Sequence, residues 1–334
     1  MSSSARLSQS STPGRPLKEA WIVEALRTPF GRYRGALSGV RPDDLAATVL
    51  EAVVARSGIN AADIDDVILG CANQAGEDNR NVARMALLVA GYPVEVPGQT
   101  VNRLCGSGLQ ALAAAANAIA VGDAEVVVAG GVESMSFVPA AGWKTVPSFE
   151  IASEAPDYYL NMGLTAEAVA KEYLVSREAQ DAFAFSSHQK ALHAIQQGFF
   201  KEGIAPIQVN EVYLDENGKK QQRTFTVATD EGVRADTSIA GLSKLKPAFA
   251  VNGSVTAGNS SQNSDGAAFV VVMSGSMVKA LGLQPIGRLV HCSVAGVDPK
   301  LMGIGPVEAI PKVLKLANMH LNDIDLIELN EAFA

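Results

Sequence analysis

The chain has 334 residues, of which 48% are apolar and 19% are charged, so it is expected to fold into about two domains and is neither disordered nor fibrous. A formal net charge of -8 excludes a general nucleic-acid binder, because phosphate affinity comes from clustered Lys and Arg side chains. Three cysteines at irregular positions, Cys71, Cys105 and Cys292, fit neither a disulfide framework nor a zinc site. We therefore expect no metal and a reducing, cytoplasmic setting.

Residues 1–19 are rich in Ser and lack the apolar core of a secretory signal, so we expect a flexible tail there. From Ala20 onward the pattern alternates between strand and helix. The expected strands are at 20–26, 67–71, 99–104 and 125–129, and the expected helices are at 43–57, 81–90 and 106–121. This alternation predicts an α/β protein with a mainly parallel sheet and helices on both faces.

The helix expected at 106–121 has an unusual composition. Between Leu109 and Val121 only Gln110 and Asn117 are polar, which predicts burial on nearly all of its faces. Its many Ala residues make it less hydrophobic than a membrane span. We therefore interpret it as a core helix, and expect no association with a membrane.

Residues 143–253 have a different character and look like a domain inserted into the first half. Helices are expected at 165–172 and 176–197. Asn217-Gly218, between apolar runs at 212–214 and 225–227, predicts a hairpin. A strand at 267–273 returns to the alternating theme, so we assign 20–142 and 254–283 to the amino-terminal half.

The chain then repeats itself in residues 284–334. A strand is expected at 288–294, a helix at 306–316 and a strand at 323–329, and the last of these matches residues 63–69 at an offset of 260. Chance similarity between two such units is the alternative. The second copy runs from 286 to 334, 49 residues against the 112 residues from 20 to 131. We therefore expect an incomplete second half, in a chain truncated relative to a longer protein.

Cys105 stands where a strand turns through small residues into the apolar helix. A helix amino terminus carries about half a positive charge and favours the thiolate form of a nearby cysteine. Gly106 and Gly108 permit a tight turn and a close approach of a ligand. These features favour a nucleophile, and the alternative is a small buried apolar residue.

Five motifs occur in order along the chain. They are Arg-Thr-Pro-Phe-Gly at 27–31, Val-Asn-Arg-Leu-Cys-Gly-Ser-Gly-Leu-Gln-Ala-Leu at 101–112, Gly-Gly-Val-Glu-Ser-Met at 130–135, Thr-Ala-Gly-Asn-Ser-Ser at 256–261 before Asp-Gly-Ala-Ala at 265–268, and Asn-Glu-Ala-Phe-Ala at 330–334. Together they resemble the motifs of thiolases over about residues 20–334. The resemblance implies a thiolase-like α/β fold of two repeated βαβαβ halves with an inserted loop domain, here with a truncated second half.

The resemblance also implies a reaction, the cleavage of a 3-oxoacyl-CoA by CoA or the reverse Claisen condensation. CoA would be a substrate, and no cofactor is implied. Cys105 would attack the 3-keto carbon and hold the acyl group as a thioester. Asn330 would hold a water that donates to the enolate oxygen. The family also implies a homodimer or homotetramer and a place in fatty-acid β-oxidation.

Seven further residues are candidates for binding CoA or the acyl chain. By resemblance Ser261 contacts pantetheine and Met162 lies beside the acyl pocket, and Phe333 belongs to the same motif as Asn330. Turn capping is the alternative for Ser261. Arg234 is a candidate phosphate neighbour, as are Arg223, Lys244 and Lys246, and solvated surface is the alternative for these charges.

The departures from the family pattern matter as much as the matches. The 334 residues contain neither the Gly-His-Pro motif that carries the family's catalytic His nor the Cys-x-Gly-x-Gly motif that carries its second Cys. The four histidines are expected on the insertion helix, within a strand and in a turn, at His188, His193, His291 and His320. Cys71 and Cys292 are expected to be buried in strands. None of these residues is expected to replace the missing groups.

We therefore expect the chain as given to be inactive in turnover. One alternative is a natural short chain that binds acyl-CoA, or pairs with an intact subunit, without catalysis. Another is a condensing enzyme of the ketoacyl synthase type, which the Leu-Cys-Gly-Ser-Gly and Asn-Glu-Ala-Phe segments disfavour.

Overall fold

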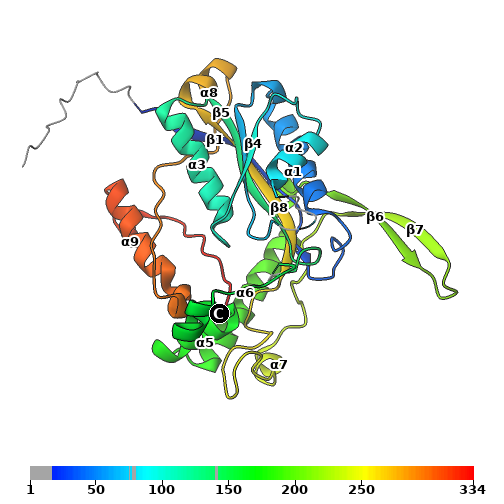
Figure 1. Ribbon diagram of the computed structural model, residues 1–334, viewed down its shortest axis with the longest axis vertical. Coiled ribbons are helices and arrows are strands. Elements are labelled where there is room, and N and C mark those ends of the chain that lie inside the picture. Colours follow the sequence, from blue (N-terminus) through cyan, green and yellow to red (C-terminus); the bar gives the residue numbers. More distant parts are fainter. Residues whose placement is uncertain (1–16, 75, 77–79, 140–141) are drawn as a thin grey trace, which may run out of the picture.

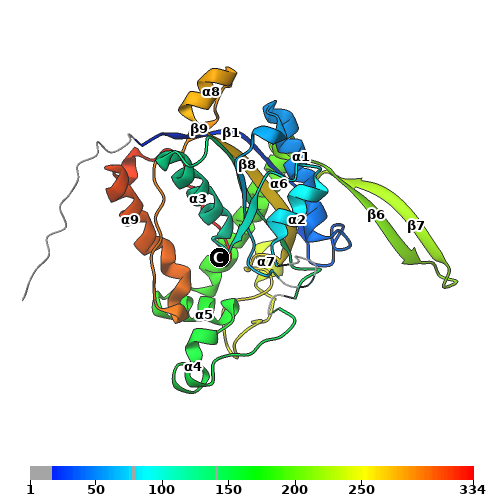
Figure 2. The same ribbon diagram turned by 45° about the horizontal axis from the view of Figure 1, so that its top comes forward.

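The computed structural model describes residues 17–74, 76, 80–139 and 142–334 (Figure 1). Most of the tail expected at 1–19 lies outside these residues. In the described part, a central sheet carries helices on both faces, and a group of helices lies beyond one end of it (Figures 1 and 2).

The core is a seven-stranded sheet in the order β4-β3-β5-β8-β1-β9, with β2 paired to β8. Its strands are β1 (Ala20–Arg27), β2 (Gly31–Arg32), β3 (Asp66–Gly70), β4 (Gly98–Val101), β5 (Val126–Ser134), β8 (Ser264–Ser274) and β9 (Gly287–Arg288). Strand β3 pairs in parallel with β4 and β5, whereas β8 runs antiparallel to both β5 and β1. The predicted parallel arrangement is present in β4, β3 and β5, and the sheet is mixed because β8 returns from the insertion and enters antiparallel between β5 and β1.

The two faces of the sheet carry different helices. Helices α1 (Pro42–Ser57) and α2 (Val82–Val89) cover one face, and α3 (Ser107–Val121) covers the other (Figure 1). Alternate residues along β3 divide between two hydrophobic clusters, with Val67 and Leu69 in the cluster of α1 and α2 and Ile68 in the cluster of α3. This is the period of two expected for a strand buried on both faces.

Helix α3 is less buried than the sequence predicts. Ala111, Ala115 and Ile119 pack on the sheet, but Leu109 is 67% exposed. All of its main contacts are with strands of the sheet, so only one of its faces is covered. Within the described residues, the segment 104–121 is long and apolar enough by composition to cross a membrane, with 28% of it buried. Because its Ala-rich face packs on strands, the structure supports its interpretation as a helix of a globular fold.

Residues 143–253 form a set of helices and a hairpin. The elements are α4 (Phe149–Glu154), η3 (Pro156–Tyr159), α5 (Met162–Glu172), α6 (Arg177–Gln197), η4 (Lys201–Gly203), β6 (Ile207–Leu214), β7 (Lys220–Val227) and α7 (Ile239–Leu242). The predicted hairpin is present, since β6 and β7 pair antiparallel and project from the body (Figure 2). Arg27, at the end of β1, donates two hydrogen bonds to Asp230, at 2.7 and 2.9 Å, and so ties this region to the sheet.

Residues 284–334 only partly follow the prediction. Helix α9 (Gly305–Ala317) forms. The short helix η6 (Leu321–Asp323) lies 260 positions after η1 (Ala61–Asp63), as the predicted repeat requires. The strands expected at 288–294 and 323–329 are wrong: only Gly287–Arg288 pairs, with β1, and Leu326 is 85% exposed. A strand needs a neighbour for its backbone hydrogen bonds, and no described strand pairs with residues 290–294 or 323–329.

Two residues differ from their expected environments because the strand predicted at 288–294 does not form. His291, expected in a strand, lies in irregular backbone. Cys292, expected to be buried, is exposed, because the strand that would have buried it does not form. Cys71 is buried as predicted.

Candidate active site

Cys105 sits on a turn between β4 and α3 that is stabilised by its own side chains. Leu104 has a φ of 47°, in the left-handed region that bulky residues rarely adopt. The side-chain oxygen of Asn102 accepts from the Leu104 amide at 2.8 Å. Ser107 Oγ donates to the Leu104 carbonyl at 2.6 Å and accepts from the Arg103 amide at 2.8 Å. These bonds hold the reversed turn, and the Cys105 side chain that follows it is exposed.

The amino end of α3 lies directly on the carboxyl ends of β3 and β5. A Cβ on Gly70 would clash with the backbone of Ser107 and would lie 2.6 Å from the Gly108 amide nitrogen. A Cβ on Gly131 would lie 2.9 Å from the Gly70 carbonyl oxygen. Glycines at these positions let helix and strands approach closely. Cys105 is thereby placed at the carboxyl edge of the parallel strands, where ligands bind in open α/β sheets.

Replacing Gly70 is expected to destabilise the fold. We expect Gly70→Ala to lower the free energy of unfolding by about 3 kcal/mol, because the new methyl group meets backbone that has no room to move. Gly108→Ala is the matched control, since nothing lies within 4 Å of its added Cβ, and it should stabilise the helix by about 0.5 kcal/mol. Urea denaturation of both variants measures the difference. Equal stability of the two variants would contradict this packing.

Glu133, near the carboxyl end of β5, is a residue to which the sequence assigned no role. Its carboxylate accepts hydrogen bonds from the backbone amides of Ala72 at 2.9 Å and Asn73 at 3.3 Å, and Cys71 Sγ lies 3.9 Å away. Burial raises the pKa of Glu133 above its ordinary value, and the two backbone hydrogen bonds oppose that shift. Its only sequence signal is a carboxylate that follows an apolar strand, inside the second glycine motif.

A second group of candidates meets where the Asn-Glu-Ala-Phe motif lies along the loop 256–261. The Ser261 amide donates to the Ala332 carbonyl at 2.9 Å, and the Ala334 amide donates to the Asn259 carbonyl at 2.9 Å. Phe333 forms an isolated bridge with Ser260. The motif that carries Asn330 therefore lies beside the loop that carries Ser261.

Phe249 joins helix α5 to this group. Its ring meets the Phe333 ring edge to face, with centroids 6.1 Å apart, and a Cβ on Gly163 would clash with it. Met162, the residue before Gly163, is 42% exposed at the start of α5. The structure thus brings Ser261, Phe333 and the Met162 segment together from three separate parts of the chain.

Helix α6 supports both the loop 256–261 and the segment around Arg234. Asn259 donates to Asp181 at 3.0 Å, and His188 Nδ1 accepts from the Arg234 amide at 3.3 Å. The pKa of His188 is lowered by burial and, to a smaller extent, by the Arg234 guanidinium. The neighbouring Ser187 donates to Glu331 at 2.6 Å. One face of α6 therefore links Arg234 to the Asn-Glu-Ala-Phe motif.

The four basic candidates do not form one cluster. The Arg234 guanidinium is exposed and pairs with Asp236 at 3.2 Å. Arg223 lies on the projecting hairpin, where it pairs with Glu211 at 2.6 Å. Lys244 and Lys246 precede Pro247, which bridges to Thr256 at the start of the Ser261 loop.

Within the described residues, no basic side chain is hydrogen-bonded to the Cys105 thiol. None of the four histidines, all of which lie in the described residues, is hydrogen-bonded to Cys105. His193 packs edge to face on Phe199, and the His320 amide bonds to Asp323. No hydrogen bond within the described part of the chain joins Cys105 to Asn330, which is exposed. In that part, no group of three or more His, Cys, Asp or Glu side chains is placed to hold a metal ion.

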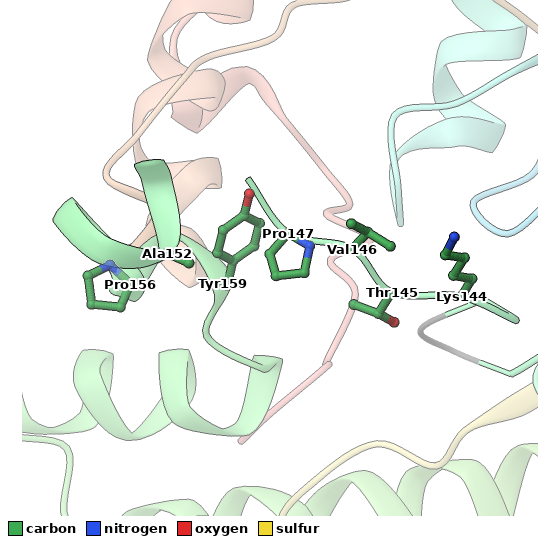
Figure 3. Close-up of a pocket in the computed structure, with 7 residues that line it drawn as sticks. All are labelled: Lys144, Thr145, Val146, Pro147, Ala152, Pro156 and Tyr159. Atoms are coloured by element: carbon green, nitrogen blue, oxygen red, sulfur yellow. The ribbon is translucent and has the colours of Figure 1, made fainter. Parts of the chain in front are cut away.

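A cavity of about 540 Å³ lies within residues 143–253 (Figure 3). It is lined by Lys144, Thr145, Val146, Pro147, Ala152, Pro156 and Tyr159. The lining is mainly apolar, and Figure 3 shows the ammonium group of Lys144 at one end of it. Tyr159 Oη accepts from the Ser148 amide at 3.0 Å, which fixes the ring in the cavity wall.

An α/β sheet with an exposed cysteine at a strand-to-helix turn defines a class of proteins suited to nucleophilic catalysis by a thiol. The chain belongs to the thiolase family: residues 20–276 match the family model "Thiolase, N-terminal domain" and residues 283–334 match "Thiolase, C-terminal domain". The thiolase-like fold and the acyltransferase class expected from the sequence are confirmed.

Curated proteins similar to this chain include thiolases with two substrate names. The 3-ketoacyl-CoA thiolase of Bacillus subtilis is 51% identical over 319 residues, which cover 95% of this chain and 82% of the relative. A beta-ketoadipyl-CoA thiolase of Acinetobacter baylyi is 45% identical, with the same coverage. The crystal structure of the Bacillus anthracis acetyl-CoA acetyltransferase superposes with a TM-score of 0.85 at 43% identity and covers 95% of this chain and 81% of that chain.

Proposed function

We propose that this chain carries out the acyl-transfer chemistry of its family on Cys105. The sulfur attacks the 3-keto carbon of a 3-oxoacyl-CoA, the C2–C3 bond breaks, and the electron pair leaves with the acetyl-CoA portion as an enolate that must take up a proton. The thiol of a second CoA then displaces the acyl group from Cys105, and the reverse sequence is a Claisen condensation. The observation that carries this proposal is the exposed thiol on the left-handed turn that opens α3.

The other candidate residues take roles around that thiol. Asn330 holds the water that donates to the enolate oxygen, where a donor already in place stabilises the developing charge. Ser261 and Phe333 contact the pantetheine and acyl parts of the substrate, and Met162 lies beside the acyl chain. The contacts among the loop 256–261, Phe249 and the start of α5 support this assignment. Residues 143–253 act as the loop domain that holds the substrate.

The 334 residues lack two of the motifs that turnover needs in this family. They supply the nucleophile and Asn330, but they contain no Gly-His-Pro and no Cys-x-Gly-x-Gly. These 334 residues alone are therefore proposed to bind and react at Cys105 without turning over. A protein that only binds acyl-CoA, or pairs with an intact subunit, is the alternative.

The substrate class has two candidates. Unsubstituted 3-oxoacyl-CoA, as in fatty-acid β-oxidation, is the first. An acyl chain that ends in a carboxylate is the second, because a single cation, Lys144, lies in an otherwise mainly apolar cavity, and relatives at 44 to 46% identity are named beta-ketoadipyl-CoA thiolases. We also propose that the protein is cytoplasmic and forms a homodimer or a homotetramer.

Binding of CoA tests the substrate half of this proposal. Arg234→Gln is expected to weaken CoA binding about fivefold at low salt, because an exposed cation beside a phosphate contributes modestly and is screened by salt. Arg223→Gln is the matched control, since both guanidinium groups pair with a carboxylate but Arg223 lies on the projecting hairpin, whereas Arg234 lies beside α6. Isothermal titration with CoA at two salt concentrations measures both dissociation constants. An equal effect of the two substitutions would remove Arg234 from the phosphate site.

A further inference from the structure

A chain of hydrogen bonds connects Glu133, on β5, to the turn that presents Cys105. Glu133 accepts from the Ala72 amide at 2.9 Å, and the carbonyl of the same residue accepts from Asn102 Nδ2 at 2.9 Å. The other end of the Asn102 side chain accepts from the Leu104 amide at 2.8 Å. Each bond has the length of a well-formed N–H···O contact.

Each link in this chain acts on a group with restricted freedom. The Glu133 carboxylate accepts from two successive amides, those of Ala72 and Asn73, and so fixes the loop after β3 at both. Asn102 uses its amide nitrogen toward that loop and its amide oxygen toward the turn, so its orientation couples the two. Leu104 takes a φ of 47°, which persists only where surrounding contacts stabilise it.

We infer that Glu133 is a positioning residue for the nucleophile: through Ala72 and Asn102 it holds the left-handed Leu104 turn that aims the Cys105 thiol. The inference rests on the proposed role of Cys105. Glu133 itself does not touch the thiol within the described contacts, and it exchanges no proton with it. Its carboxylate sets the position of the loop, and the loop sets the orientation of the Asn102 amide.

The chain offers a matched control for this role. Asp65 also accepts from two successive amides, those of Glu125 at 2.7 Å and Val126 at 3.0 Å. These amides lie at the amino end of β5, whereas Glu133 lies near its carboxyl end. A carboxylate that is merely structural and one that positions the nucleophile can therefore be compared at the two ends of one strand.

The experiment is alkylation of the 334-residue protein by iodoacetamide, with the rates at Cys105 and Cys292 followed by peptide mass spectrometry. Both thiols are exposed, so at a fixed pH their ratio corrects for reagent concentration. Glu133→Gln is expected to lower the Cys105 rate relative to Cys292 about fivefold, because the Ala72 and Asn73 amides bond to different carboxylate oxygens and Gln has an oxygen at only one of those two positions. Asp65→Ala, which removes the single oxygen that accepts from both Glu125 and Val126, should leave the ratio unchanged, even if it lowers stability as much.

Asn102→Asp is a second variant that tests the same chain of hydrogen bonds if Glu133→Gln fails to fold. Asp keeps an oxygen for the Leu104 amide but has no N–H for the Ala72 carbonyl, so it removes one link from an exposed position. We expect the same fall in the ratio, and no further fall when Glu133→Gln is added to it. Additive effects of the two substitutions, or a ratio that Glu133→Gln leaves at its wild-type value, would overturn the inference. If Cys105 in the wild-type protein reacts no faster than Cys292, the proposed role of Cys105 itself fails.

Discussion

The 334-residue protein is expected to show no thiolysis of acetoacetyl-CoA above the rate without enzyme. In this family a His in Gly-His-Pro and a Cys in Cys-x-Gly-x-Gly move protons to and from the reacting groups, and both motifs are absent from these residues. A general acid or base contributes about 10² to 10⁴ to the rate. The resemblance implies that the same His also donates to the enolate oxygen, and an oxyanion donor contributes a further factor of about 10² to 10³. Loss of both functions therefore lowers turnover at least about 10⁴-fold.

The control for this result supplies the missing motifs. A segment that carries Gly-His-Pro and Cys-x-Gly-x-Gly, taken from a thiolase that has both motifs, can be appended after residue 334. The extended chain should cleave acetoacetyl-CoA, and Cys105→Ala in that extended chain should abolish the activity. Turnover by the 334-residue protein that disappears in Cys105→Ala would contradict the account, because a base would then exist among these residues.

Bromoacetyl-CoA is expected to react with Cys105 far faster than iodoacetamide does, after correction for the intrinsic reactivities of the two reagents. The thiolate displaces bromide and forms a thioether, so the reaction needs neither of the missing motifs. If CoA binds beside Cys105 as proposed, the bound reagent is held at a high effective concentration, and we expect an acceleration of about 10² or more at this thiol.

Cys292 is the internal control for this reaction. It is exposed, as Cys105 is, but lies in irregular backbone outside the proposed site. Its rate ratio between the two reagents should stay near the ratio for a free thiol. Cys105→Ser should remove the fast phase, and excess CoA should slow it in the wild-type protein. A similar acceleration at both cysteines would mean that CoA binding does not direct the reagent to Cys105.

The local parts of this architecture could be predicted from the sequence because their signals are local. The apolar helix after Cys105 and the hairpin at Asn217-Gly218 follow from patterns within a few residues, and both are present. The antiparallel direction of β8 could not be predicted, because it depends on where the insertion returns the chain to the sheet. The same holds for α3, whose exposed face depends on which elements cover it.

Apolar alternation also gave wrong strand predictions for residues that pair with no described strand. The segments at 288–294 and 323–329 have the pattern of strands, but a strand forms only beside another strand that satisfies its amides and carbonyls. Glu133 was missed for a related reason. Its contacts reach Ala72, 61 positions away, and continue through Asn102, 30 positions from Ala72, and no pattern along the chain reports such contacts.

The central claim is that Cys105, on the turn that opens α3, is the thiol that takes the acyl group from the 3-oxoacyl-CoA substrate. The most direct measurement is a peptide map of the wild-type protein after a short reaction with less than one equivalent of bromoacetyl-CoA. The expected result is a CoA-thioether on the peptide that contains Cys105, with Cys292 unmodified and the adduct lost when CoA is present in excess. An adduct mainly on Cys292, or one on Cys105 that excess CoA does not prevent, would contradict the claim.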